Sequence, residues 1–548
     1  MKRPEDVKLS RAEGDALIER VKANTLTEDD RRVVVKLIEL WFWLNFALTE
    51  AKLSMKRLKR LLFGRGHEGN DDDNETPPPS GAEADATEPA ATDTPSPSPD
   101  DEPVDETESR PKRRGHGRNS AQAYTGAQVV ACCHERLQVG EVCPACGRGK
   151  LYRLPPGVEL RLDGHALLSA MRYELEKLRC SACGEIFTAP LPAEAGEQKY
   201  SAPARAVVVL ARYYLGLPFY RVETFQAAVG VPVADATLWE LAEQVANCLY
   251  PVFDQLVYDA AQSAILYHDD THARILSLLI ENRKAAAGDI PALERTGIVT
   301  TGVVAQNGER TIILYFSGRQ HAGENLSQLL EKRPAELPKP LVMSDALAAN
   351  TLSNEEAVIR CYCLFHGRRQ FDDLTEVFPQ ASRRVIDDLK QVFQFEAHTR
   401  EQAMSGEQRL AYHQRHSRPI LEKLKPWLEQ QLDEHEVEPN SSLGKAMAYL
   451  LNHWPKLTRF LTEVNAPLDS NIVERALKLM IRQRKNSLFY ASAYSAAVGS
   501  LLTSVLATCV AAGVNVLHYL VAVQANRTAV GRTPSAWLPW NYTEQLVT

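Results

Sequence analysis

The sequence predicts a multidomain α+β protein, for three reasons. Its 548 residues exceed what a single hydrophobic core usually holds. Apolar residues near the N-terminus follow a heptad pattern, which indicates a long helix. From residue 262 onward, strand-like apolar runs alternate with helical patterns. We divide the chain into eight segments, which are residues 1–65, 66–125, 126–195, 196–260, 261–378, 379–465, 466–525 and 526–548.

The first segment, residues 1–65, is expected to be helical. Thr27 and Asp30 resemble an N-terminal cap. Apolar residues then recur at alternating spacings of four and three, at Leu37, Trp41, Leu44, Leu48, Ala51, Met55, Leu58 and Leu62. This seam favours a coiled-coil dimerisation helix. The alternative is an amphipathic helix that packs on its own protein.

Residues 66–125 are expected to form a disordered acidic linker followed by a basic arm. Residues 68–108 hold 15 acids and no base, and they contain almost no large apolar side chain. The overall charge of −7 therefore leaves about +8 for the rest of the chain, which permits nucleic-acid binding. The arm, which includes Arg113 and Arg114, either contacts a DNA backbone or is a solvated run of charge.

Two Cys-x-x-Cys pairs in residues 126–195 predict a zinc ribbon. Cys143 and Cys146 form the first pair, and Cys180 and Cys183 follow after 33 intervening residues. Four thiolates at this spacing suit a tetrahedral structural Zn²⁺ site. We expect strands between the pairs and a DNA-docking role. The alternative is two turns with free thiols.

The pattern in residues 196–260 is helical, and we expect a DNA-binding or connecting region there. A loose helix-turn-helix pattern could place its second helix in a major groove, although plain helical packing explains it equally well. No secretory signal is visible at the N-terminus, and paired cysteines of this type favour a reducing compartment. We therefore expect a cytoplasmic protein without a membrane span.

Residues 261–378 are expected to form the first part of a ribonuclease-H-like domain. An apolar run ends in Asp269 and Asp270, a strand pair turns at Asn307-Gly308, and another short strand ends in Asp345. The order strand, strand, strand, helix, strand, helix, strand, with a distant final helix, is typical of that fold. In that order the ends of the first and fourth strands lie side by side.

The final helix of the domain carries Glu474, so three carboxylates are expected to meet: Asp269, Asp345 and Glu474. Carboxylate oxygens are the ligands of hard cations such as Mg²⁺, and Mn²⁺ is a substitute. Two such ions about 4 Å apart support phosphoryl transfer on nucleic acid. A face of bases follows Glu474 and is expected to contact phosphates, namely Arg475, Lys478, Arg482 and Lys485. The alternative is an ion-paired surface helix.

Two further regions complete the domain. Residues 379–465 are expected to form a helical insertion in which Trp427 and Trp454 belong to the core. Residues 466–525 hold the closing helices, and the long apolar run near their end is interrupted by glycines and hydroxyl residues. That run is expected to be a buried helical pair, and 526–548 a tail.

The sequence resembles the transposases of the insertion sequence 66 group, within the aspartate-aspartate-glutamate superfamily. The resemblance rests on the stretches KRLKRLLFGR, YHDDTHARIL, VMSDALAAN, CLFHGRRQF, LDSNIVERALKLMIRQRKNSLF and LPWNY, together with the cysteine pairs. It implies that Asp269, Asp345 and Glu474 are the catalytic acids. It also matches the pattern Cys-x-x-His-x-Arg-Arg, which places His366, Arg368 and Arg369 near the scissile phosphate or the metal.

The resemblance implies an enzyme that cuts transposon ends and joins them to target DNA. Double-stranded DNA, a homodimer or higher oligomer, and small accessory proteins are the implied partners, in a bacterial cytoplasm at the nucleoid. The group has Asp-Glu-Thr-Pro where this chain has Asp269-Asp270-Thr271-His272, which leaves open whether Asp269 or Asp270 faces the metal. A catalytically silent DNA-binding regulator and a structure-specific nuclease remain the alternatives.

Overall fold

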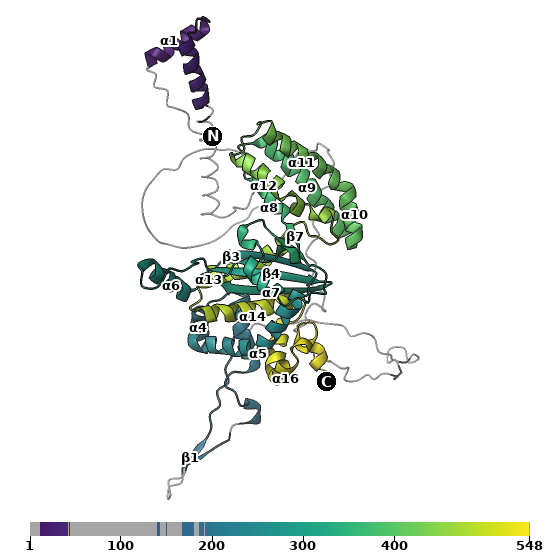
Figure 1. Ribbon diagram of the computed structural model, residues 1–548. Helices are drawn as coiled ribbons and strands as arrows, with labels where there is room; N and C mark the ends of the chain where they lie inside the picture. The colour runs from purple at the N-terminus through teal and green to yellow at the C-terminus, as the bar shows by residue number, and fades with distance from the viewer. Residues whose placement is uncertain are drawn as a thin grey trace, which may run out of the picture. The chain divides into compact units, whose positions relative to one another are not determined.

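The computed structural model describes residues 11–41, 43, 140–142, 150, 167–179, 186–190 and 192–546 (Figure 1). The chain divides into two compact units, one of residues 1–55 and 163–548 and one of residues 56–162. Several predictions fall outside the described residues and stay predictions. They concern the zinc ligands Cys143, Cys146, Cys180 and Cys183, the arm residues Arg113 and Arg114, and the heptad seam beyond Trp43.

The N-terminal region contains α1 (Arg11–Lys22) and, after a turn, a helical stretch over residues 28–41. The predicted cap at the start of that stretch is confirmed. The Thr27 amide donates to Asp30 Oδ2 at 3.0 Å, and the Asp30 amide donates to Thr27 Oγ1 at 3.2 Å. Arg20 also pairs with Asp30 at 2.8 Å, which fixes α1 to the helix that follows.

A small hairpin of β1 (Lys177–Arg179) and β2 (Ile186–Thr188) lies beside the second cysteine pair in the sequence. Residues 171–176, for which we expected strand, are irregular and exposed. Among the described residues they have no strand to pair with, so the ladder begins only at Lys177.

A five-stranded mixed sheet forms the centre of the larger unit. Its strands lie in the order β5-β4-β3-β6-β7. The first three pair antiparallel, and β6 and β7 run parallel to β3. The predicted adjacency of the first and fourth strands is therefore confirmed. The bounds are β3 (Ile265–His272), β4 (Val299–Asn307), β5 (Arg310–Gly318), β6 (Leu341–Ser344) and β7 (Ile359–Tyr362).

Three details of the predicted element order are wrong. First, a helix that was not predicted, α6 (Leu276–Ala287), lies between β3 and β4. The helix predicted after the third strand is present as α7 (Ala322–Leu330). Between β6 and β7 only two short 3-10 turns occur, at Ala348–Asn350 and Glu355–Ala357. The fifth strand is shorter than expected. Helix α8 (Leu364–Asp372) begins almost directly after it and carries the His-x-Arg-Arg residues His366, Arg368 and Arg369.

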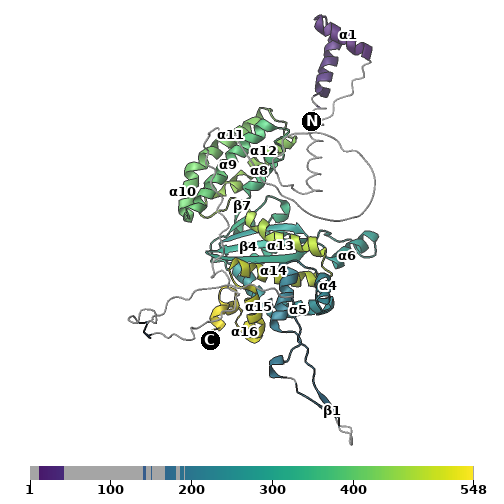
Figure 2. The same cartoon turned by 180° about the vertical axis from the view of Figure 1, so that it is seen from behind.

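Helices cover both faces of the sheet (Figures 1 and 2). One face shares a core with α3, α5 and α15, and the C-terminal residues Trp537 and Tyr542 join that core. The expected C-terminal tail is thus folded. The bounds are α3 (Ala202–Val209), a π-helical turn (Leu210–Tyr214), α4 (Phe219–Ala228), α5 (Asp235–Ala261), α15 (Val516–Ala525), α16 (Arg527–Arg532) and 3-10 turns at Ala193–Ala195, Pro534–Trp537 and Tyr542–Leu546.

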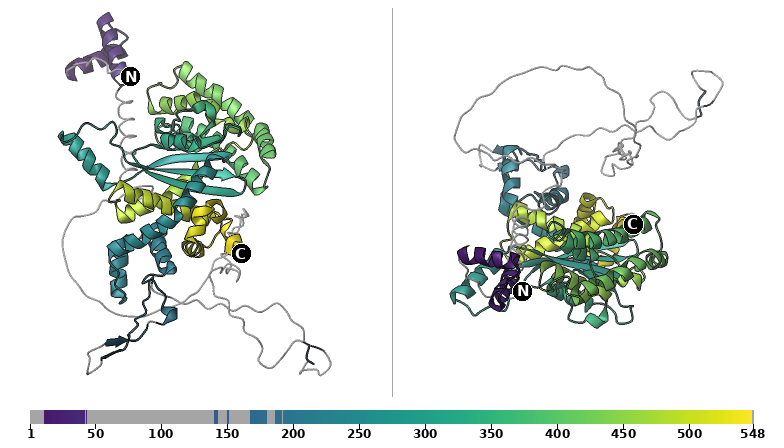
Figure 3. Two further views of the ribbon diagram at one scale, coloured as in Figure 1. Left: turned by 60° about the horizontal axis from the view of Figure 1, so that its bottom comes forward. Right: turned by 90° about the horizontal axis from the view of Figure 1, so that it is seen from above.

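The opposite face packs against α13 (Asn471–Ser487) and the helical insertion, as Figure 3 also shows. The insertion is confirmed as helical. It consists of α9 (Pro379–Glu401), α10 (Gly406–His416), α11 (Arg418–Asp433), α12 (Ser442–Leu457) and a 3-10 turn (Arg459–Leu461). Trp427 and Trp454 are partly buried against its core, as predicted. Gly302 lets α13 lie close to β4, because a Cβ there would stand 2.8 Å from Leu477 Cδ2.

The long apolar helix α14 (Ala493–Ala511) covers the open edge of the sheet at β5. Among the described residues it is the helix that could cross a membrane by length and composition, yet 72% of its apolar window is buried within the protein. Its hydroxyls bond the unpaired backbone of β5. Ser504 Oγ accepts from the Tyr315 amide at 2.8 Å, and Thr508 Oγ1 accepts from the Ile313 amide at 3.0 Å. An edge strand has unpaired backbone amides, and the hydroxyl side chains of α14 accept hydrogen bonds from them. This explains why a buried helix contains serine and threonine.

Candidate active site

Three acids lie on neighbouring elements on the α13 side of the sheet. Asp269 lies on β3, Asp345 follows β6 directly, and Glu474 is in the first turn of α13. Strands β3 and β6 are parallel neighbours, so their carboxyl ends meet at one edge. Alternation places Asp269 on the same side as Tyr267, which packs in one core with Val473 of α13.

The charges of these acids act on one another. Burial raises the pKa of Asp269, and together with the negative charges of Asp345, Glu474 and Asp270 it brings that pKa to about 7. A hydrogen bond from the Asp270 amide to Asp269 Oδ1, at 2.8 Å, opposes this shift. Asp345 and Glu474 therefore lie near enough to Asp269 for their charges to oppose its ionisation.

Each acid is held through one carboxylate oxygen. Asp345 Oδ1 accepts from the Leu347 amide at 3.2 Å and from the Asn350 side-chain amide. Glu474 Oε1 accepts from Ser470 Oγ at 3.4 Å. Among the described residues no hydrogen bond or ion pair reaches Asp269 Oδ2, Asp345 Oδ2 or Glu474 Oε2. The same part of the chain contains no group of three His, Cys, Asp or Glu side chains already gathered as a metal site.

Asp270 lies on the other face of the sheet and has a structural role. Its carboxylate accepts from Thr301 Oγ1 at 2.6 Å and from the Ala322 amide at 3.0 Å, and it pairs with His321 Nδ1 at 2.9 Å. Ala322 is the first residue of α7, so Asp270 caps that helix. The geometry separates the two adjacent aspartates, with Asp269 turned toward the other acids.

The start of α13 is fixed against α8. The Leu364 amide donates to the Leu468 carbonyl at 2.9 Å, and the Ser470 amide donates to Cys363 Sγ at 3.3 Å. Asp469 Oδ1 accepts from the Asn471 amide at 3.0 Å at the start of α13, and the Ser470 hydroxyl donates to Glu474 Oε1. These contacts set the direction in which Glu474 projects.

The three residues predicted on the segment after the fifth strand separate in space. His366 Nε2 lies 3.7 Å from Glu474 Oε1, so His366 joins the acid cluster. Arg368 pairs with Asp372 on its own helix at 3.6 Å. Arg369 is half-buried. His366 thus contacts one of the three acids, whereas Arg368 pairs on its own helix.

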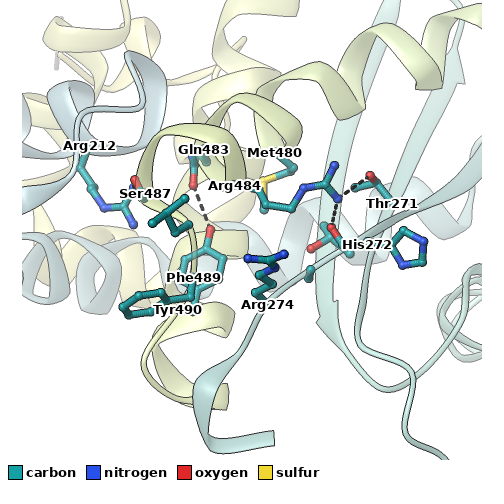
Figure 4. A pocket seen from close by; sticks show the side chains of 13 residues that line it. Arg212, Thr271, His272, Arg274, Met480, Gln483, Arg484, Ser487, Phe489 and Tyr490 are labelled. Atoms are coloured by element: carbon teal, nitrogen blue, oxygen red, sulfur yellow. Dashed lines mark hydrogen bonds between the residues drawn. The ribbon is translucent and has the colours of Figure 1, made fainter. Parts of the chain in front are cut away.

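The predicted basic residues of α13 form an exposed stripe. Arg475, Lys478, Arg482 and Lys485 are all exposed, and their spacing of three and four places them on one side of the helix. Arg482 also donates to the Tyr214 carbonyl. Arg484 points elsewhere and bonds Thr271 Oγ1 at 3.2 Å, as Figure 4 shows.

The sequence analysis missed a buried arginine behind the acids. Arg360, on β7, is 4% exposed. It donates to Ser344 Oγ at 2.9 Å and to the Asn350 carbonyl at 3.0 Å, and its Nη1 lies 3.0 Å from His268 Nε2. Burial and the Arg360 charge hold the pKa of His268 well below its usual value, so the neutral ring accepts this bond. The sequence feature that could have revealed this residue is an arginine within a short apolar strand, at Ile359–Tyr362.

Comparison with known proteins assigns a family to this region. The model of the family described as "Transposase IS66 family" matches residues 198–497. The uncharacterized protein y4jD of Sinorhizobium fredii is 27% identical over 421 residues, which cover 73% of this chain and 78% of that protein. The uncharacterized protein y4hP of the same organism is 22% identical, with 67% of each chain covered. No solved structure matches.

Proposed function

The chain belongs to the IS66 family of transposases, and from this premise we propose that it cuts DNA at transposon ends and joins the ends to target DNA. The sheet order supports a ribonuclease-H-like catalytic domain, because its first strand is central and lies beside the fourth. The proposal rests on the placement of Asp269 on β3, of Asp345 directly after the neighbouring strand β6 and of Glu474 in the first turn of α13.

The three carboxylates fit a divalent cation. Each has one oxygen that no described protein group bonds, and Asp269 has a pKa of about 7 because burial and two nearby negative charges oppose its ionisation. Asp269, Asp345 and Glu474 would therefore hold Mg²⁺ or Mn²⁺. When bound, the metal supplies Lewis-acid activation of the attacking oxygen and stabilises the departing one.

The other residues act by position and charge. Asp270 fixes the end of β3 through α7, and His366 borders Glu474, where it can hold a proton or a phosphate oxygen. The stripe of Arg475, Lys478, Arg482 and Lys485 offers contacts to a DNA backbone. The zinc ribbon, the basic arm and the coiled-coil helix remain predicted DNA-binding and dimerisation segments.

The test is metal-dependent cleavage of a duplex that contains the ends of the insertion sequence, with the full chain. We expect cutting with Mg²⁺ and joining of the freed 3′ end to a second duplex. Asp345→Asn keeps the shape of the side chain and removes its charge, so cleavage should be lost while DNA binding remains. Cleavage at the wild-type rate by this variant would contradict the proposed site. Cleavage without joining would indicate a nuclease, and binding without cleavage a silent regulator.

A further inference from the structure

An aromatic cavity opens beyond the C-terminal end of α13, away from the acids. It measures about 760 Å³, and α4, the start of α5 and residues 485–495 line it. Seven aromatic residues line it, namely Tyr213, Phe219, Tyr220, Trp239, Phe489, Tyr490 and Tyr494. Three of them are strongly exposed: Tyr220 at 55%, Phe489 at 45% and Tyr494 at 49%. Large aromatic groups gathered at a surface usually mark a binding site.

Cations accompany these rings. Three basic residues, Arg212, Arg221 and Lys485, line the cavity. One acidic residue, Asp235, lines it as well. The Arg212 guanidinium lies 5.4 Å from the Phe219 ring centroid and donates to Ser487 Oγ at 2.7 Å. The combination of ring faces and positive charge suits a ligand that is planar, aromatic and attached to phosphate.

A strained turn presents two apolar side chains beside the cavity. Leu488 has φ 66° and ψ −47°, and the Phe489 amide donates to the Ser487 carbonyl at 2.8 Å. This is a γ-turn with positive φ, which is rare for a residue with a side chain. As a result Leu488, at 55%, and Phe489, at 45%, are exposed instead of packed.

The surrounding structure holds this turn in place. The Tyr490 amide donates to the Arg274 carbonyl at 2.9 Å, and the Tyr490 hydroxyl donates to Gln483 Oε1 at 2.9 Å. Figure 4 shows the adjoining pocket, in which Tyr490 and Gln483 are joined and Phe489 lies beside Tyr490. A strained backbone conformation that hydrogen bonds of the neighbouring residues hold in place is typical of functional positions.

The basic stripe of α13 connects the cavity to the acids. Glu474 and Lys485 are 11 positions apart on one helix, which corresponds to about 16 Å along its axis. A DNA strand advances about 3.4 Å per nucleotide, so the stripe spans roughly five nucleotides. A strand that follows the stripe from the acids therefore reaches the cavity.

We propose that this cavity takes up one unpaired nucleobase of the bound DNA, about five nucleotides from the position that is cut. This inference rests on the proposed function. The base stacks on the exposed rings, chiefly Tyr220 and Phe489, and Lys485 and Arg221 contact the flanking phosphates. A paired base has to leave the helix to enter, and the Leu488–Phe489 turn is placed to separate it from its neighbours.

The test compares two fluorescein-labelled duplexes of the same sequence, measured by anisotropy with the full chain and without metal. One carries a single unpaired thymidine, and the other carries an abasic spacer at that position. The backbone charges are the same, so contacts from the basic segments cancel. We expect the thymidine duplex to bind roughly 5- to 100-fold more tightly. Tyr220→Ala and Phe489→Ala should each remove most of this difference.

Phe225→Ala is the matched control, because Phe225 lies on the same helix as Tyr220, is 45% exposed and does not line the cavity. It should keep the preference for thymidine. Equal affinity of the wild-type chain for the two duplexes, or the same preference in all three variants, would overturn the inference. Failure to bind any duplex would instead count against the proposed function, so the two failures are distinguishable.

Discussion

The substitution Asp269→Asn should stabilise the metal-free protein at a pH above about 7. In the folded chain the pKa of Asp269 is raised from 3.8 to about 7, chiefly by burial. An acid with a raised pKa binds its proton more tightly in the folded state, so folding weakens as the pH rises from about 4 to about 7. At 1.36 kcal/mol for each pKa unit, the full effect is roughly 4 kcal/mol as an upper limit.

The assay is urea denaturation of wild type and variant, followed by tryptophan fluorescence, at about pH 5 and about pH 8. Asparagine keeps the shape and can still accept from the Asp270 amide, so the wild-type packing is preserved. We expect the stability gain of the variant to be larger at the higher pH. Mg²⁺ should then stabilise the wild type more than the variant, since a bound cation offsets the same repulsion.

Asp289→Asn serves as the control, because Asp289 is exposed and lies outside the acid cluster. It should change stability equally at the two pH values. The reasoning would be refuted if Asp269→Asn gave the same change in unfolding free energy at about pH 5 and about pH 8. It would also be refuted if Mg²⁺ stabilised that variant as strongly as the wild type.

Three further predictions concern other parts of the domain. Glu474→Gln should abolish Mg²⁺-dependent cleavage while a gel-shift assay shows unchanged DNA binding; retained cleavage would remove Glu474 from the site. Arg360→Met leaves the buried His268 ring, Ser344 Oγ and the Asn350 carbonyl without their donor and should cost about 3 kcal/mol in urea denaturation; a change within error would show that these contacts do not stabilise the fold. Ser504→Val leaves the Tyr315 amide unpaired and should cost about 1–3 kcal/mol, whereas Ala497→Val on the exposed side of α14 should be nearly neutral by thermal denaturation.

The acids illustrate how far sequence patterns reach in this protein. Strand ends that carry Asp269 and Asp345 were predicted from apolar runs, and their adjacency followed from the order of elements. The choice between Asp269 and Asp270 could not be made from sequence, because alternation only says that they face opposite sides. The choice required the position of α13 on one face and of α7 on the other.

The basic residues were predicted correctly where local helical spacing decides their positions and incorrectly where packing does. Helical spacing correctly predicted a stripe on α13, which is a local property of 3.6 residues per turn. The His-x-Arg-Arg residues were expected to act together. In the structure Arg368 pairs with Asp372 and His366 lies beside Glu474, because the segment is a helix on which these two side chains point in different directions.

The sequence by itself determined the α+β class, the helical insertion and the adjacency of the first and fourth strands. Each of these depends on periodicity or on the order of elements, which are properties of the chain. Tertiary structure alone decided which aspartate faces Glu474, the buried contacts of Arg360, and the cover that α14 provides for the edge of β5. These depend on contacts between residues far apart in the sequence, and such contacts are set by packing.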